Sequence, residues 1–156
     1  GVMLLIGAAS QAEDPLHPLE KLRIGQVSGR SNGTQHLAFL PVSTVTELDE
    51  QIRLAEQLNK PVMLDFYADW CVACVEMAHD TFSSPVVANA LKPVVLLQAD
   101  ITSNDDNAQA MLKRFGLFGP PSVLFFNDQG QEMRALRVMG SMDAEHFVEH
   151  IKPLAI

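Results

Sequence analysis

Two cysteines at the end of an apolar run constrain the fold of this chain more than any other feature. Val62 to Tyr67 is predicted to form a buried strand, and Cys71 and Cys74, the only cysteines in the sequence, follow it closely. A helix is expected to start at Cys71, where unpaired backbone N–H groups and the positive end of the helix dipole stabilise a thiolate. Cys74 lies one helical turn later, so its thiol can attack a mixed disulfide and release the partner. This strand-to-helix junction therefore predicts thiol–disulfide exchange.

Two other interpretations of the cysteine pair are weaker. A purely structural disulfide would close a very short loop and would constrain the unfolded chain little. A zinc site would need two further ligands, and the histidines of the sequence form no convincing second half-site. These histidines are His17, His36, His79, His146 and His150. We therefore expect a redox pair that uses no metal and no cofactor.

Length and charge narrow the class of protein. The chain has 156 residues, enough for one domain with a hydrophobic core, and its 47% hydrophobic content is typical of a globular α/β protein. Its formal net charge of −8 argues against a surface that binds nucleic acid or anionic membranes.

The N-terminal segment differs in character from the rest of the chain. Gly1 to Ala9 is apolar and uncharged, but it is too short to span a bilayer. It could be the end of a transmembrane helix of a preceding domain, the tail of a signal peptide, or an apolar segment that packs on the domain. Glu13 to Gly33 contains several prolines and glycines among polar residues and is predicted to be a linker.

Hydrophobic periodicity and turn signals predict alternating strands and helices along the remainder. Thr44 and Glu47 form a capping-box pattern at a helix start, and we expect caps at Ser103 or Asn104 and at Ser141 or Asp143 for two later helices. The predicted strands are 36–42, 62–67, 94–99, 123–126 and 132–139, and the predicted helices are 45–58, 71–80, 85–91, 105–115 and 144–151. This order predicts an α/β sandwich with early parallel strands and a late hairpin.

Asp65 interrupts the most apolar of these strands. A charge inside a central strand is unfavourable unless it has a partner or a task. One interpretation is a half-exposed strand end with a hydrogen-bonded carboxylate. The other is a buried acid beside the cysteine pair that moves protons for the second thiol.

With these features in place, the chain resembles the thioredoxin superfamily. Residues 67–74, with Met77, Thr81-Phe82-Ser83 and Pro85 downstream, closely resemble the C-terminal periplasmic domain of the DsbD family of thiol:disulfide interchange proteins. The resemblance covers about residues 36–152. It implies a thioredoxin-like fold, with a central mixed β-sheet flanked by helices and an N-terminal linker. It also implies that residues 1–33 are a membrane-helix stub and linker, and that 34–156 form the thioredoxin-like domain.

The resemblance further implies an electron relay on the periplasmic side of the bacterial inner membrane. A transmembrane domain of the same protein would reduce this domain, which would then reduce the N-terminal periplasmic domain. Disulfide isomerases and cytochrome c maturation thioredoxins would receive the electrons indirectly.

Site residues follow from the resemblance position by position. Cys71 matches the exposed nucleophile, Cys74 the resolving thiol and Asp65 the buried acid. Pro121 matches the cis-proline opposite the active site, against the alternative of an ordinary trans Pro-Pro turn. Trp70, Pro120 and Pro121 are the expected substrate-binding residues.

The sequence departs from the family pattern at two positions. Ala78 stands where relatives often carry a second acid, and Glu76 lies on a different side of the helix from Cys74. Pro120, before the expected cis-proline, has no backbone N–H.

The residues between the cysteines bear on the direction of electron flow. Val72 and Ala73 offer no side-chain donor to a thiolate, which favours a reducing couple over an oxidising one. Two other classes stay open: a thiol oxidant or disulfide isomerase for secreted proteins, and a binding module without turnover.

Overall fold

The computed structural model describes residues 37–154, and these form a five-stranded mixed β-sheet flanked by helices. The strand order across the sheet is β1-β3-β2-β4-β5. The strands are β1 (Leu40–Pro41), β2 (Val62–Tyr67), β3 (Val95–Asp100), β4 (Ser122–Phe126) and β5 (Val138–Met139). β1 and β2 run parallel to β3, whereas β4 is antiparallel to β2 and β5 is antiparallel to β4. The predicted fold class is confirmed, and the predictions for residues 1–33 lie outside the described residues.

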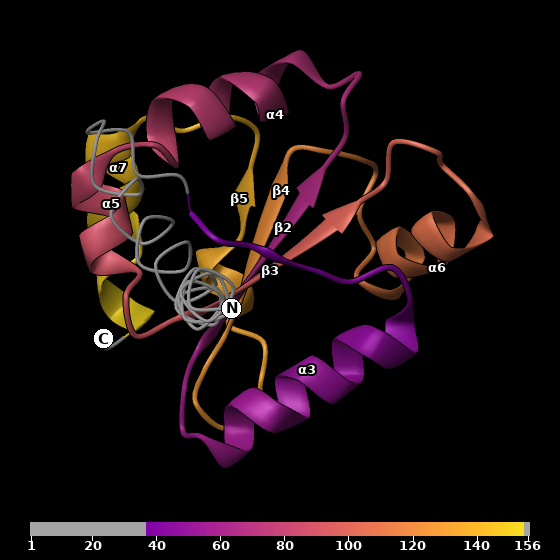
Figure 1. Cartoon of the computed structure of the whole chain (residues 1–156), viewed down its shortest axis with the longest axis horizontal. Helices are drawn as coiled ribbons and strands as arrows, with labels where there is room; N and C mark the ends of the chain where they lie inside the picture. Colours follow the sequence, from indigo (N-terminus) through magenta and orange to yellow (C-terminus); the bar gives the residue numbers. More distant parts are fainter. Residues whose placement is uncertain (1–36, 155–156) are drawn as a thin grey trace, which may run out of the picture. The chain divides into compact units, whose positions relative to one another are not determined.

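Helices cover both faces of the sheet (Figure 1). α3 (Val45–Gln57) and α6 (Asp106–Arg114) contribute to one hydrophobic cluster, and α5 (Pro85–Ala90) and α7 (Ala144–His150) contribute to the other. α4 (Val72–Glu76) begins beyond the carboxyl end of β2 and continues directly into a π-helix, η1 (Met77–Thr81). Two short 3-10 helices complete the description: η2 (Arg134–Leu136) and η3 (Lys152–Leu154).

Strand β2 separates the two hydrophobic clusters. Leu64 and Phe66 belong to the cluster under α3 and α6, whereas Met63 belongs to the cluster under α5 and α7. This alternation follows from the two-residue repeat of a strand, and burial on both faces explains why β2 is almost wholly apolar. Asp65 comes two residues after Met63 in the strand, so it lies on the same face of the sheet, the one that α5 and α7 cover.

Helix starts follow the predicted capping chemistry, with one error. The Thr44 hydroxyl accepts the Glu47 N–H at 3.1 Å, and the Glu47 carboxylate accepts the N–H of Ser43, one residue earlier than in a regular capping box. The expectation of Ser103 or Asn104 at the start of α6 is wrong, because the cap is Asp105, whose Oδ1 accepts the Ala108 N–H at 2.8 Å. Asn104 instead occupies a left-handed turn, with φ of 50°.

Asp143, one of the two expected residues, caps α7 in the same way. Its Oδ1 accepts the backbone N–H of His146 at 2.8 Å. Ser84 is the N-cap of α5 without a side-chain hydrogen bond, and Pro85 occupies the first turn as expected.

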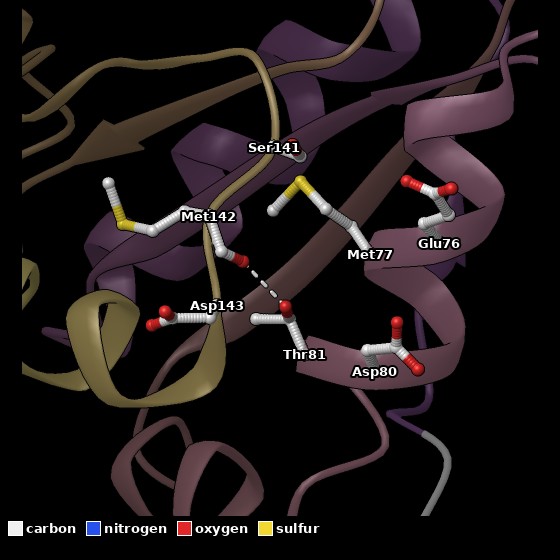
Figure 2. Close-up of a pocket in the computed structure, with 7 residues that line it drawn as sticks. All are labelled: Glu76, Met77, Asp80, Thr81, Ser141, Met142 and Asp143. Atoms are coloured by element: carbon white, nitrogen blue, oxygen red, sulfur yellow. Dashed lines mark hydrogen bonds between the residues drawn. The ribbon is translucent and has the colours of Figure 1, made fainter.

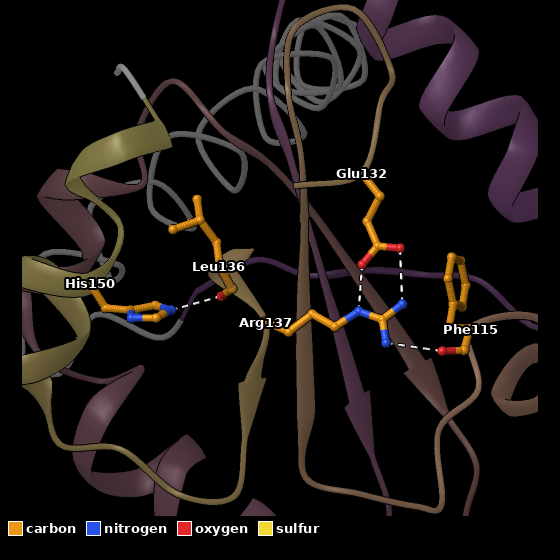
Figure 3. A network of polar contacts seen from close by, with 5 residues as sticks. All are labelled: Phe115, Glu132, Leu136, Arg137 and His150. Atoms are coloured by element: carbon orange, nitrogen blue, oxygen red, sulfur yellow. Dashed lines mark hydrogen bonds and ion pairs between the residues drawn. The ribbon is translucent and has the colours of Figure 1, made fainter. Parts of the chain in front are cut away.

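The predicted strand 132–139 is interrupted, which is a second correction. Glu132 makes only an isolated bridge to Phe126, η2 follows, and pairing resumes at β5. Figure 3 shows that Arg137, just after the interruption, forms a bidentate ion pair with Glu132, just before it, with N–O distances of 2.6 and 3.0 Å. The 3-10 turn also buries Leu136, so side-chain contacts replace ladder hydrogen bonds here.

The first strand is also shorter than the predicted 36–42. Among residues 37–42, only Leu40 and Pro41 pair with β3 in the sheet. Val42 adds one backbone hydrogen bond to Gln98, at 2.9 Å.

The end of the active-site helix is tied to the loop before α7. Figure 2 shows the buried Thr81 hydroxyl donating to the Met142 carbonyl oxygen at 2.5 Å. The pocket drawn there lies between these two elements and is lined by the carboxylates of Glu76, Asp80 and Asp143. Because Thr81 ends η1, this bond fixes the far end of the segment that begins at Cys71.

Candidate active site

Cys71 and Cys74 form a disulfide at the start of α4. Their Cα atoms are 5.3 Å apart. Both residues are buried, with 7% of Cys71 and 4% of Cys74 exposed, so in the disulfide form Cys71 is not the exposed residue that the resemblance implied. Cys71 is the N-cap of the helix, and its sulfur accepts the Cys74 N–H at 3.2 Å. The same N–H would point at the Cys71 sulfur in the reduced protein, where it would stabilise a thiolate.

Cys74 lies deeper, against the end of strand β2. Its sulfur is 3.9 Å from the carbonyl oxygen of Phe66, the residue that follows Asp65. This arrangement gives the two sulfurs different surroundings: Cys71 faces the helix N-terminus, and Cys74 faces the strand.

Asp65 is a buried carboxylic acid, so the half-exposed strand end is excluded. Only 5% of the residue is exposed, and its Oδ2 accepts a hydrogen bond from the Gln98 amide at 3.1 Å. Burial raises the pKa of Asp65 from 3.8 to about 6, and the hydrogen bond from Gln98 opposes part of that rise. Gln98 is the parallel-strand neighbour of Asp65, a pairing that the sequence analysis did not identify.

Pro120 and Pro121 lie at the same edge of the sheet as the cysteine pair. The bond between them is cis, as expected for Pro121. Ser122 pairs with Phe66, so the residues before β4 lie beside those that follow β2. The Pro121 carbonyl accepts the Gly140 N–H at 3.1 Å, and Ser122 Oγ donates to the Gly119 carbonyl at 2.8 Å.

Trp70 immediately precedes the disulfide and is 58% exposed. Its indole N–H donates to the carbonyl oxygen of Thr102 at 3.0 Å. Sequence analysis missed Thr102, although its place just after β3 was a usable signal, because the carboxyl ends of the parallel strands β2 and β3 meet at one edge.

Exposed apolar residues also occur in the segments around the disulfide. They are Val72 and Val75 on α4, Phe118 in the loop before Pro120, and Met139 on β5, next to Gly140. Together with Trp70 they are the kind of surface that buries against a protein partner.

Within residues 37–154, no three His, Cys, Asp or Glu side chains lie close enough together to bind a metal ion. The same described part of the chain has no helix long and apolar enough to cross a bilayer.

Known proteins are similar to this chain in sequence and in fold. The family model for thioredoxin-like proteins matches residues 44–128. The thiol:disulfide interchange protein DsbD of Ralstonia nicotianae is 43% identical over 152 residues, which are 97% of this chain and 25% of that protein. The crystal structure of the oxidised DsbD C-terminal domain of Neisseria meningitidis is 35% identical, with a TM-score of 0.63 over 74% of this chain and 98% of that one.

This chain belongs to the thioredoxin-like family and, within it, to the DsbD C-terminal domains. DsbD of Klebsiella pneumoniae is 53% identical over 117 residues, which are 75% of this chain and 19% of that protein. The chain therefore spans about a quarter or less of the length of these DsbD relatives.

Family membership and the paired cysteines define the chemistry of this DsbD domain. It is a thiol–disulfide oxidoreductase of the protein-disulfide reductase type, with Cys71 and Cys74 joined in the oxidised form. The alternative of a thiol oxidant or disulfide isomerase is not favoured by these relatives.

Proposed function

We propose that this domain is one of the electron carriers in a relay within a larger DsbD protein. A membrane-embedded domain of the same protein reduces the Cys71–Cys74 disulfide, and the resulting dithiol reduces the N-terminal periplasmic domain. Disulfide isomerases and cytochrome c maturation thioredoxins are the later acceptors. The observation that carries this proposal is a disulfide at the start of a helix in a DsbD C-terminal domain that matches only a fraction of its relatives.

The relay places the domain on the periplasmic side of the inner membrane. Residues 1–33 would then be the end of the preceding transmembrane helix and a linker, and residues 34–156 the working domain. The length of the DsbD relatives beyond the matched part leaves room for both the membrane domain and the N-terminal domain.

Cys71 is the nucleophile of the proposed reaction. Its thiolate attacks the partner disulfide, forming a Cys71–partner bond and releasing one partner thiolate, which takes up a proton. Cys74 loses its proton and attacks the Cys71 sulfur, which re-forms the internal disulfide and releases the second partner thiol. Two electrons pass to the partner in each cycle.

Asp65 is the proposed proton acceptor for Cys74. Asp65 directly precedes Phe66, whose backbone carbonyl oxygen is 3.9 Å from the Cys74 sulfur. With a pKa of about 6, the carboxylate is mostly ionised at neutral pH and close to a pH at which it can take up a proton. No second carboxylate assists at Ala78.

Trp70, Pro120 and Pro121 form the proposed contact surface for the partner. Trp70 offers an exposed ring beside the nucleophile, and the loop at the same edge of the sheet offers the backbone carbonyl of Pro120. Apolar contact combined with a few backbone hydrogen bonds suits a carrier that must bind and release quickly.

Electron transfer between purified domains tests the relay. The reduced 156-residue chain should reduce the oxidised N-terminal domain of a DsbD protein, and thiol counting should show two electrons transferred per chain. A chain that instead oxidises reduced, unfolded secreted proteins faster than it reduces this domain belongs to the oxidant or isomerase class. The side chains of Val72 and Ala73, which donate no hydrogen bond, favour the first result.

A further inference from the structure

We propose that Thr102 is a positioning residue that holds Trp70 ready for partner docking. Consecutive residues of the active-site corner bind to this one threonine. The Asp69 N–H donates to Thr102 Oγ1 at 2.9 Å, and the Trp70 indole N–H donates to the Thr102 carbonyl oxygen at 3.0 Å. The threonine lies more than thirty residues further along the chain, so it ties two separate loops together.

Asp100 fixes the orientation of the Thr102 hydroxyl. The Thr102 N–H donates to Asp100 Oδ1 at 2.9 Å, and the Thr102 hydroxyl contacts the same oxygen. A carboxylate oxygen can only accept, so the hydroxyl proton points to Asp100 and an oxygen lone pair is left for the Asp69 N–H. The direction of each hydrogen bond in this chain of contacts is therefore determined.

The sheet places this threonine against the corner before Cys71. Asp100 pairs with Tyr67 at the ends of β3 and β2, and the Ile101 N–H donates to the Tyr67 carbonyl at 2.8 Å. The segments that follow β2 and β3 therefore start side by side. Thr102, two residues after the end of β3, contacts Asp69 and Trp70 in the segment after β2. The Thr102 hydroxyl therefore binds the segment that directly precedes the nucleophile Cys71, through the Asp69 N–H.

Holding Trp70 leaves its apolar surface free for a partner. The only polar atom of the indole is satisfied by Thr102, while 58% of the residue stays exposed. A ring that is already held loses less freedom when a partner covers it, which favours association. This inference rests on the proposed role of Trp70 in partner contact.

Trp70 is the only tryptophan in the sequence, so its fluorescence reports directly on whether the Thr102 contacts hold the indole ring in place. Thr102→Val keeps the branched shape and the backbone carbonyl that binds Trp70, but it removes the hydroxyl that accepts the Asp69 N–H and contacts Asp100, so that carbonyl is no longer held in place. Thr102→Ser keeps the hydroxyl. The matched control is Thr44→Val: Thr44 is also half-buried and accepts a backbone N–H through Oγ1, but at the start of α3. Acrylamide quenching of Trp70 should increase in Thr102→Val and stay at the wild-type level in Thr102→Ser and Thr44→Val.

The rates of reduction separate docking from chemistry. For Thr102→Val we expect kcat/KM for reduction of the N-terminal DsbD domain to fall about threefold to tenfold, mainly through KM, as for loss of one net hydrogen bond. Reduction of a small aromatic disulfide, which needs no docking surface, should stay unchanged.

Three results would overturn the proposed role of Thr102. They are quenching in Thr102→Val that matches the wild type, quenching in Thr44→Val that rises as much as in Thr102→Val, or a loss of rate in Thr102→Val that is as large toward the small disulfide as toward the N-terminal domain. If the wild-type chain does not reduce the N-terminal domain at all, the relay is rejected. The quenching comparison then still decides whether Thr102 holds Trp70.

Discussion

At the scale of single residues, Asp65 is the clearest case of a side chain that works against folding. Burial raises its pKa from 3.8 to about 6, so between these pH values the folded chain keeps a proton that the unfolded chain has released. Stability therefore falls as pH rises from about 4 to about 6, and the full penalty is present above that range. The shift corresponds to about 3 kcal/mol.

Asp65→Asn removes this penalty and nearly preserves the shape of the side chain. We expect the oxidised variant to be more stable than the wild type at pH 7, by up to about 3 kcal/mol, with the difference shrinking toward pH 4. Urea unfolding at a series of pH values measures this. Parallel pH profiles for the two proteins would show that the buried carboxyl is not the cause.

The same substitution should change the titration of the reduced cysteines. A carboxylate near a thiol opposes a second negative charge, so Asp65→Asn should lower the apparent pKa of Cys71. Thiolate absorbance followed against pH measures the shift. A titration identical to that of the wild type would reject electrostatic coupling between Asp65 and the cysteine pair.

Pro120 is expected to weaken partner binding. In thioredoxin-like folds the residue before the cis-proline usually pairs with the partner backbone, and a proline there keeps the acceptor but lacks the donor. Pro120→Thr restores an N–H, and one net hydrogen bond of about 0.5–1.5 kcal/mol predicts about threefold to tenfold tighter binding. Surface plasmon resonance with Cys71→Ser/Cys74→Ser proteins isolates the non-covalent part.

We expect most of the Pro120→Thr effect in slower dissociation. Equal or weaker binding, with the fold intact, would mean that the missing N–H does not limit affinity and that Pro120 only stiffens the loop.

At the scale of elements, the Arg137 network connects the hairpin to the loop that carries Pro120. Arg137 donates to the Phe115 carbonyl at 3.0 Å as well as binding Glu132 (Figure 3). Phe115 ends α6, and the loop to β4 begins after it. The two charged side chains are only 15% and 16% exposed, so solvent competes weakly for them.

Arg137→Met leaves Glu132 without its partner in a largely buried place. We expect a loss of about 1–3 kcal/mol in the free energy of unfolding. The matched control is Arg53→Met: Arg53 pairs with Glu50 at 3.6 Å, but the side chains are 58% and 60% exposed. The control should change stability by no more than about 0.5 kcal/mol. Equal losses in the two variants would show that burial of the Arg137 pair is unimportant.

The elements also show what sequence alone can predict. Strand β2, helix α3 and the cysteine pair were predicted correctly because apolar spacing, the Thr44 cap and the strand-to-helix junction are local signals. The break at residues 134–136 was missed, and so were the contacts of Arg137 with Glu132 and Phe115, the second of which is distant in sequence. The Asp105 cap was missed because three polar residues in a row offered equivalent signals.

In the candidate site, too, some residues could be predicted from the sequence and others could not. Cys71, Cys74 and the cis bond at Pro121 could be expected from motif and resemblance. Gln98 could not, because its contact arises only when β3 is placed beside β2, and Thr102 could be expected only by someone who had already paired these two strands.

At the scale of the whole molecule, the domain is a proposed electron carrier between two partners. Both partners must reach the same sulfur, since Cys74 lies deeper, against the end of β2. The exposed apolar residues in the surrounding segments are compatible with repeated docking and release. A carrier of this kind needs one nucleophile for both half-reactions.

Trapping the mixed disulfide shows which of the two cysteines attacks the partner. Cys74→Ser removes the resolving thiol, so mixing this variant with the oxidised N-terminal domain of a DsbD protein should yield a stable covalent complex through Cys71. Cys71→Ser should yield none, and non-reducing electrophoresis with mass spectrometry identifies the bond. A complex that forms in Cys71→Ser through Cys74, and not in Cys74→Ser, would contradict the assignment of the nucleophile and with it the proposed relay.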